Sequence, residues 1–153
     1  MATANTNSTK SIDELNNLLQ GEISAVETYR IALEKLTDGG LRDTLDACLR
    51  SHSQRVDVLK QKVIANGGVP TETSGAWGVF ARSAETVSAS LGDKNGVATL
   101  ENGEDHGLKS YQVDTDKLTA EARSVINNDL LPLQLETHRI ISMLKKQQTP
   151  KSV

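Results

Sequence analysis

Five polar residues lie at positions where the helical repeat of this 153-residue chain calls for apolar ones. They are Glu22, His52, Arg55, Glu104 and His138. A charged group on the core face of a helix is strongly disfavoured unless it is paired or bound to a metal ion. The five side chains are therefore expected to meet partners inside the protein, and they are the residues most able to do chemistry.

One interpretation is a metal site in the core. Glu22, His52, Glu104 and His138 supply two carboxylates and two imidazoles, ligands that suit one zinc or iron ion. Glu101 precedes Glu104 by three residues and shares its helical face, so it is a further candidate ligand. A di-iron centre in a helical bundle uses four carboxylates and two histidines, more than converge here.

The other interpretation needs no metal. The guanidinium group of Arg55 is a fixed positive fork that bridges two carboxylates. Glu22, Arg55 and Glu104 would then form a buried ion-paired network that is hydrogen-bonded to the histidines. In that case the protein is a structural, stress-related or partner-binding bundle, and the sequence leaves both interpretations open.

The apolar residues around these positions recur every three or four residues, which is typical of amphipathic helices. The pattern predicts long helices from the capping residue Ser11 to the glycine pair at 39–40, from Leu41 to Ala65, from Val97 through Tyr111, and from Leu118 to Lys146. A shorter helix, residues 76–91, is predicted between the second and third and is followed by a break at 92–96. Glycine favours the backbone conformation that ends a helix, so the pair at 39–40 is expected to terminate the first one.

Pro132 lies inside the last predicted helix. Proline removes a backbone hydrogen bond and clashes with the preceding turn, so a kink or bulge is expected between Asn128 and Pro132. The whole pattern predicts one all-α domain, an antiparallel four-helix bundle over residues 11–147. Residues 1–10 and 148–153 are expected to be a disordered leader and tail.

The composition limits the partners and the location. The net charge is −3 and the pI is near 5.6, and no cluster of Lys and Arg is dense enough to suit nucleic acid. No apolar run approaches the roughly 20 residues that span a bilayer. Cys48 is the single cysteine, and the first ten residues lack the apolar stretch of a secretory signal. We therefore expect a cytoplasmic protein with neither a nucleic-acid nor a membrane partner.

Three parts of the sequence resemble known proteins. Residues 15–22, followed by Ala25 and Tyr29, resemble the first helix of bacterioferritin and rubrerythrin-like proteins, and residues 55–70 resemble the end of their second helix. Glu104-Asp105 with Tyr111 and Trp77 is similar to an uncharacterised bacterial family of ferritin-like four-helix proteins of unknown function. The resemblance implies a ferritin-like bundle and a homodimer.

The same resemblance implies roles for individual residues. Glu22, Glu104 and His138 match metal ligands of the first, third and last helices, which would make iron or zinc the cofactor. His52 and Arg55 stand where those families have Glu and then His, and Leu135 stands where they have Glu. The resemblance therefore assigns no enzyme activity.

Overall fold

The computed structural model describes the backbone of residues 2–148 and the side chains of residues 3–78 and 96–148. Over these residues every regular element is a helix, which confirms the prediction of an all-α protein. In chain order the elements are α1 (Ala2–Lys35), α2 (Gly39–Ala65), the short 3-10 helix η1 (Gly75–Trp77), α3 (Gly78–Tyr111), α4 (Ala120–Ser124), the π-helix η2 (Val125–Leu130) and α5 (Leu131–Gln148).

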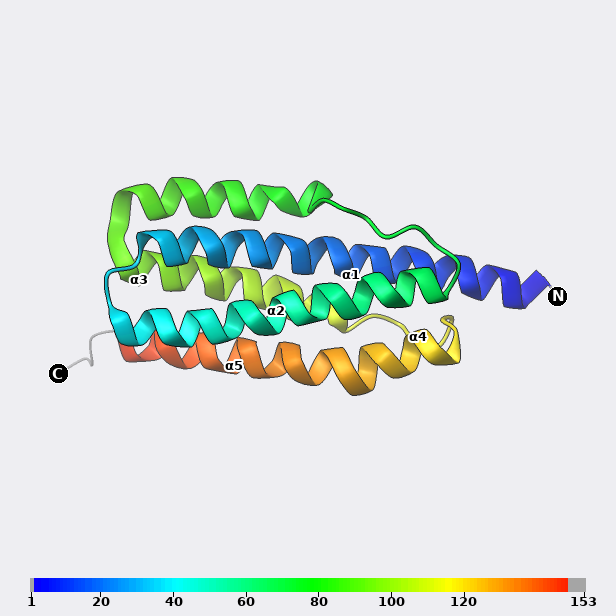
Figure 1. The fold of residues 1–153 in the computed structure, drawn as a ribbon. Helices are drawn as coiled ribbons and strands as arrows, with labels where there is room; N and C mark the ends of the chain where they lie inside the picture. Colours follow the sequence, from blue (N-terminus) through cyan, green and yellow to red (C-terminus); the bar gives the residue numbers. More distant parts are fainter. Residues whose placement is uncertain (1, 149–153) are drawn as a thin grey trace.

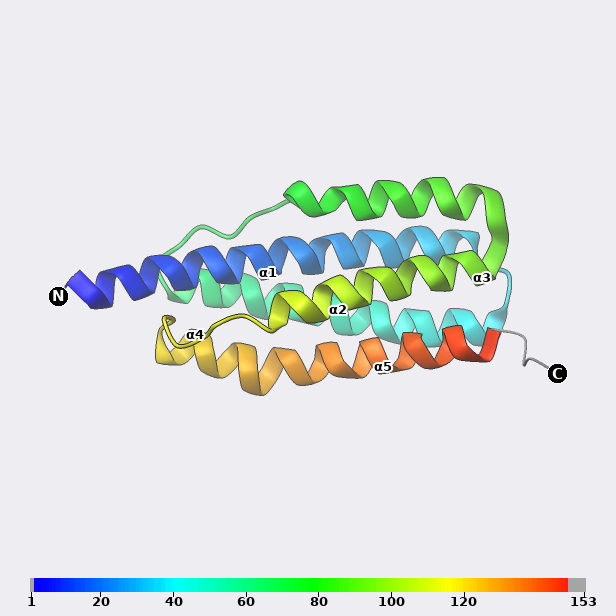
Figure 2. The same cartoon turned by 180° about the vertical axis from the view of Figure 1, so that it is seen from behind.

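Four long rods lie side by side: α1, α2, the second part of α3, and the continuous run of α4, η2 and α5 (Figures 1 and 2). The rods α1 and α2 run in opposite directions. The ribbon of α3 turns back on itself, so its first part lies outside the four rods and its second part lies among them (Figure 1). As a result α2 and the second part of α3 run in the same direction, and α1 runs opposite to both.

The first helix begins earlier than predicted. It starts at Ala2, so residues 2–10 are helical and the prediction of a start at Ser11 is wrong. Ser11 is fully buried, and its hydroxyl donates to the carbonyl of Asn7 and accepts the backbone N–H of Thr119 at 2.9 Å. A side chain that joins two parts of the chain in the core is not available as a helix cap. Residues 149–153 of the predicted tail lie outside the described part.

The turn between α1 and α2 also differs from the prediction. α1 ends at Lys35, and Asp38 caps α2 by accepting the backbone N–H of Leu41 at 2.8 Å. The two glycines at 39–40 therefore open α2 and do not end α1. The end of α2 was predicted correctly: Gly67 follows it with a φ of 85°, the left-handed conformation that glycine adopts readily.

The bundle core has a polar centre between two apolar ends. One end is formed by residues early in α1, late in α2 and around η2, among them Leu15, Leu59 and Leu130. The other is formed late in α1, early in α2 and on α5, among them Leu36, Leu45 and Ile141. Every rod runs from one apolar end of the bundle to the other. The polar positions predicted from the sequence therefore fall halfway along the bundle.

The predicted bulge before Pro132 is confirmed. The six residues of η2 form a π-helix, and the backbone N–H of Leu131 bonds to the carbonyl of Ile126. A π turn is a common way to accommodate a break in regular helical hydrogen bonding.

The backbone of α3 is helical from Gly78 to Tyr111, so the break predicted at 92–96 is absent. The side chains of residues 79–95 lie outside the described part.

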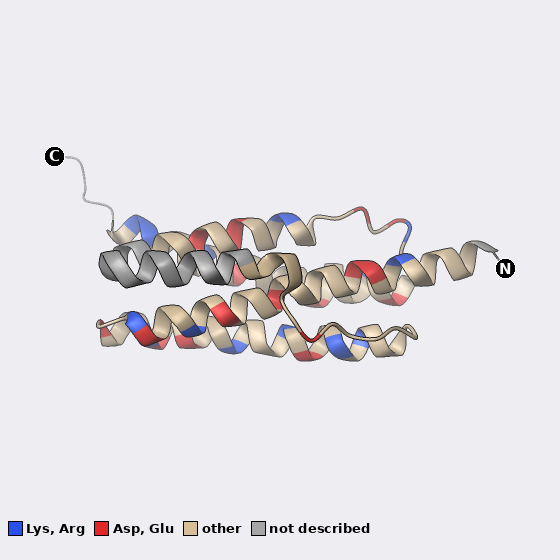
Figure 3. Ribbon diagram, turned by 90° about the horizontal axis from the view of Figure 1, so that it is seen from above, with Lys and Arg blue, Asp and Glu red and all other residues tan. Residues whose placement is uncertain are grey.

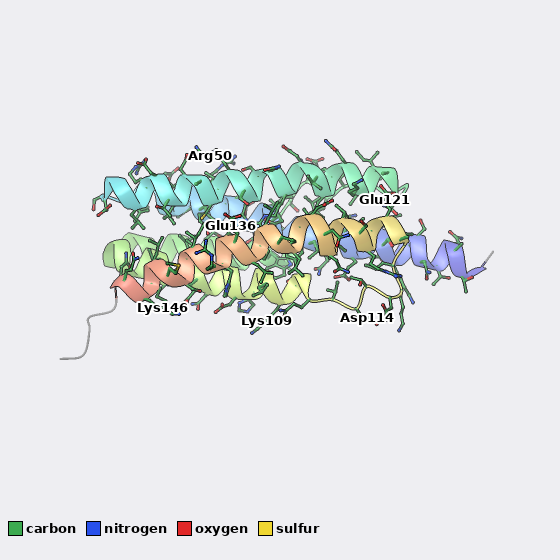
Figure 4. All side chains as sticks on the ribbon, turned by 90° about the horizontal axis from the view of Figure 1, so that it is seen from below. Arg50, Lys109, Asp114, Glu121, Glu136 and Lys146 are labelled. Carbon is green, nitrogen blue, oxygen red and sulfur yellow. The ribbon has the colours of Figure 1, made fainter. Side chains whose placement is uncertain are left out.

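Charged side chains of both signs are interspersed along the described helices (Figure 3). Those labelled in Figure 4, such as Arg50 on α2 and Lys109 on α3, lie on the outside of the bundle. Within residues 2–148, no helix combines the length and the apolar character required to cross a membrane.

Candidate functional site

One imidazole connects two carboxylates at the centre of the bundle. Nδ1 of His52 on α2 lies 2.6 Å from Oε2 of Glu22 on α1, and its Nε2 lies 2.9 Å from Oε1 of Glu104 on α3. Each of the three residues is only 3% exposed. Three of the four rods are thus linked by buried ionisable side chains.

Arg55, one turn after His52 on α2, adds a second positive group and is fully buried. Its Nη1 lies 3.0 Å from Oε1 of Glu22 and also donates to Oε1 of Gln134. Its Nη2 donates to Oγ1 of Thr137 at 3.2 Å and lies 2.9 Å from Nδ1 of His52. The guanidinium group therefore joins α2 to both α1 and α5.

Two tyrosines each donate a hydrogen bond to the glutamate of the other helix. The hydroxyl of Tyr29 donates to Oε1 of Glu104, and that of Tyr111 donates to Oε1 of Glu22, both at 2.5 Å. Glu22 and Tyr29 lie seven residues apart on α1, and Glu104 and Tyr111 lie seven apart on α3. Seven residues are nearly two helical turns, so each pair shares one face, and the opposite directions of the two helices bring each tyrosine to the other helix's glutamate.

Gln134 and Thr137 on α5 donate to the remaining carboxylate oxygen, Oε2 of Glu104. The side-chain N–H of Gln134 and the hydroxyl of Thr137 each lie 2.9 Å from Oε2 of Glu104. Both residues are buried, and we did not predict either from the sequence. The signal was available, because Leu130, Gln134, Thr137 and Ile141 follow the same steps of four and three. We refer to Glu22, Tyr29, His52, Arg55, Glu104, Tyr111, Gln134 and Thr137 as the buried network.

Opposite charges in the buried network stabilise one another, whereas the charge of Arg55 acts to lower the pKa of the neighbouring His52. Burial alone would raise the pKa of Glu22, but the charges of Arg55 and His52 outweigh it and lower that pKa. Burial likewise acts to raise the pKa of Glu104, and the hydrogen bond and charge of His52 lower it. For His52, burial acts to lower the pKa, and the charge of Glu22 raises it above the usual value. When His52 is protonated, two carboxylates face one imidazolium and one guanidinium, and the four charges sum to zero.

Both tyrosines stay neutral donors. Burial, followed by the charge of the glutamate that each contacts, raises the pKa of Tyr29 and of Tyr111 well above the usual value of 10. A protonated hydroxyl beside a carboxylate can only donate its hydrogen bond in that direction. The tyrosines are consequently fixed hydrogen-bond donors at neutral pH.

Two of the predicted site residues lie elsewhere. Nε2 of His138 is 2.7 Å from Oδ1 of Asp105, and its side chain is 25% exposed. Glu101 pairs with Lys145 near the surface. Leu135, where a ligand was expected from the family resemblance, is exposed. On α5 the inward positions are one residue earlier than expected, at Gln134 and Thr137.

The arrangement of donors and acceptors does not fit a metal ion. Each carboxylate oxygen already accepts a hydrogen bond from a protein group, and both ring nitrogens of His52 face carboxylates. Arg55 places a permanent positive charge beside Glu22, where a cation would have to bind. Among the side chains of residues 3–78 and 96–148, no three His, Cys, Asp or Glu form a group suited to a metal.

A small cavity of about 40 Å³ adjoins the buried network between α1 and α3. Its lining includes Tyr29, Glu104 and Gln134 together with Gly103 and Gly107. A single water needs roughly 10–15 Å³ of such space, so the cavity is large enough to hold water. Its polar lining comes from residues whose hydrogen bonds are already made.

The two glycines beside the cavity provide a matched pair of variants. A Cβ at Gly103 meets nothing within 4 Å, so Gly103→Ala should raise the free energy of unfolding by about 0.5–1 kcal/mol, the usual gain within a helix. A Cβ at Gly107 would lie 2.9 Å from Nε2 of Gln134, which bonds to Glu104. Losing that charged hydrogen bond costs about 1.5–3 kcal/mol, so Gly107→Ala should be the less stable variant in urea unfolding. Equal stabilities would show that Gln134 is not held in place.

Comparison with known proteins places the chain in a family. Neither the curated proteins nor the solved structures gave a match. The family described as "Domain of unknown function (DUF2383)" matches residues 10–114. This span contains Glu22, His52, Arg55 and Glu104 and ends before Gln134 and Thr137. Because the match covers more than half of the sequence, the chain belongs to the DUF2383 family.

Proposed function

We propose that this protein is a ferritin-like bundle that works without a metal ion and acts through its surface, with the buried network as its fixed structural centre. The observation that carries the proposal is the complete pairing of Glu22, His52, Arg55 and Glu104 by one another and by neutral donors. A centre with no free ligand and no net charge offers little to a metal or a substrate. Its contribution is to fix how the four rods align.

The helix directions support the ferritin-like part of the proposal. One long connection, made of residues 66–77 and the first part of α3, carries the chain along the bundle from α2 to the second part of α3 (Figure 1). A single long crossover of this kind distinguishes ferritin-like bundles from up-and-down bundles, in which all connections are short. The cytoplasmic location expected from the sequence stays a prediction.

A groove on the outside of the bundle supports the homodimer expected from the family resemblance. It has a volume of about 390 Å³ and lies between α1 and α2. Its lining combines apolar side chains with charges of both signs, namely Ile23, Val26, Val56, Glu27, Arg30, Asp57 and Lys60. A surface with both signs of charge can pair with a second copy of itself, so we propose this face for self-association.

The competing hypothesis is a metal site. It assigns iron or zinc to Glu22, His52, Glu104 and His138. In the structure this assignment would require His138 to leave Asp105 and turn inward, and Arg55 to leave Glu22. The two hypotheses differ in a quantity that can be measured directly, the metal content of the purified protein.

We expect the untagged protein to retain far less than one equivalent of metal after separate incubation with Fe(II), without oxygen, and with Zn(II). Elemental analysis after gel filtration measures this. The variant that combines Glu22→Ala with His138→Ala is the control, and it should show the same background. One equivalent or more on the native chain, lost in the double variant, would falsify the proposal and restore the metal site.

A further inference from the structure

The second half of the buried network repeats the first at a constant distance along the chain. Arg55 and Thr137, which are hydrogen-bonded to each other, are 82 residues apart. The same separation relates other members of the buried network: Glu22 with Glu104, Tyr29 with Tyr111, and His52 with Gln134. Every position of the buried network therefore has a counterpart in the other half of the protein.

The apolar core follows the same repeat. Buried residues that are also 82 positions apart are Leu15 with Val97, Leu18 with Leu100, Leu36 with Leu118, Cys48 with Leu130, and Leu59 with Ile141. Two of these five pairs are identical, as are the glutamate and tyrosine pairs of the buried network, and the other pairs differ in residue type but share their burial. The repeat relates α1 to the second part of α3, and α2 to the last helix.

The protein is thus made of two similar helical hairpins. In each, a glutamate on the first helix is followed 30 residues later by an inward residue on the second, His52 in one hairpin and Gln134 in the other. A second inward residue follows three positions further on, Arg55 and Thr137 respectively. The two hairpins pack so that both sets point to the middle of the bundle.

In other helical bundles, six inward positions arranged in this way hold two metal ions. Di-metal carboxylate centres in helical bundles take one Glu from each of two helices and a Glu-x-x-His pair from each of the other two. Glu22 and Glu104 occupy the two single positions. The two pairs are here His52-x-x-Arg55 and Gln134-x-x-Thr137, so four of six ligands are replaced while all six positions are kept inward and in contact.

The replacements balance in charge. Four carboxylates offset two divalent metal ions, whereas the two carboxylates here face two cationic side chains. We infer that the bundle is a duplicated helical hairpin built on the plan of a di-metal carboxylate centre, in which Arg55 and His52 supply the positive charge that metal ions supply elsewhere. The inference extends the proposed function, since it gives a physical reason why the native bundle needs no metal.

The inference predicts that four substitutions create a metal site. The variant that combines His52→Glu, Arg55→His, Gln134→Glu and Thr137→His should bind about two Co(II) ions per chain, as the di-metal plan requires. Visible absorption of Co(II) and elemental analysis measure this. The control variant combines His52→Glu and Arg55→His with Leu135→Glu, which forms a Glu-x-x-His pair with the native His138, one residue out of register. It should bind clearly less.

Each result bears on the inference. A folded four-substitution variant that binds no Co(II), or binding as strong in the control, overturns it. Four carboxylates repel one another, so the metal-free variant can lose helical circular dichroism; in that case added Co(II) should restore the signal, and failure to do so also overturns the inference. Metal on the native chain is a separate result, because it contradicts the proposed function and leaves the positions of the repeat as they are.

Discussion

Replacing Arg55 with alanine should lower the free energy of unfolding by about 3–5 kcal/mol, the cost of removing one partner from a buried ion pair. The change leaves Glu22 without its guanidinium partner and removes the bonds to Gln134 and Thr137. Urea unfolding followed by circular dichroism measures the effect. It is the largest change that we expect from a single substitution in the buried network.

Arg50→Ala is the matched control for this experiment. Arg50 lies on the same helix and pairs with Asp46 four residues before it, but its side chain is 71% exposed and lies on the outside of the bundle (Figure 4). Exposed pairs of this kind contribute about 0.3–0.5 kcal/mol. If Arg55→Ala cost no more than Arg50→Ala, the guanidinium group would not be paired in the core.

A second pair of variants separates the lost ion pair from the lost packing. Arg55→Met keeps most of the side-chain volume and leaves Glu22 unpaired. Adding Glu22→Gln removes the unpaired charge, so the double variant should be more stable than Arg55→Met alone. A double-mutant cycle of this kind gives the interaction energy between the two residues. An additive result would show that the two side chains do not interact.

The stability of the native protein should be highest in mildly acidic solution and fall on both sides. Folding lowers the pKa of Glu22 and of Glu104, so their contribution is complete above the unfolded value of about 4.3 and is lost as pH falls through the folded values. Folding raises the pKa of His52, so its contribution is complete below about 6.5 and is lost as pH rises through the folded value.

The expected maximum of the unfolding free energy therefore lies between about pH 4.3 and pH 6.5. Each unit by which a folded-state pKa departs from its unfolded value changes stability by about 1.36 kcal/mol, and three groups of the buried network contribute. Urea unfolding at a series of pH values measures the curve. His52→Gln should remove most of the alkaline decline, whereas His106→Gln, at an exposed histidine, should keep it. A decline that persists unchanged in His52→Gln would assign it to other groups.

The part of the site that carries charge was predictable from the sequence. Glu22, His52, Arg55 and Glu104 stand out because each interrupts an apolar stripe, and all four lie together in the core. On α2 the pattern predicts a core face of Leu41, Leu45, Cys48, His52, Arg55, Leu59 and either Lys62 or Val63; the first six are buried, and of the last two Val63 is the buried one. A strong period and a large cost for an unpaired charge leave few other arrangements.

The neutral part of the site could not be found in the same way. Gln and Thr are mostly exposed in proteins, so Gln134 and Thr137 do not point to a core face, and the rarer His138 drew the prediction one residue too far along α5. Similarly, Ser11 has the local features of a helix cap but serves a contact with Thr119, more than a hundred residues away in sequence. Long-range contacts of this kind leave no mark on the local pattern.

The π-helix η2 keeps the two hairpins in register where their local spacing differs. Before it, the buried residues of the last helix lie one position closer to their counterparts in α2 than after it: Ala122 corresponds to Leu41 and Ile126 to Leu45, whereas Leu130 corresponds to Cys48. The stretch through η2, where residues 127–129 are exposed, thus holds one residue more than the matching stretch of α2, and this offsets a connection that is one residue shorter, because Leu36 and Leu118 before it are again 82 positions apart. The wide turn accommodates the extra residue locally, so Gln134 and Thr137 still face the centre of the bundle.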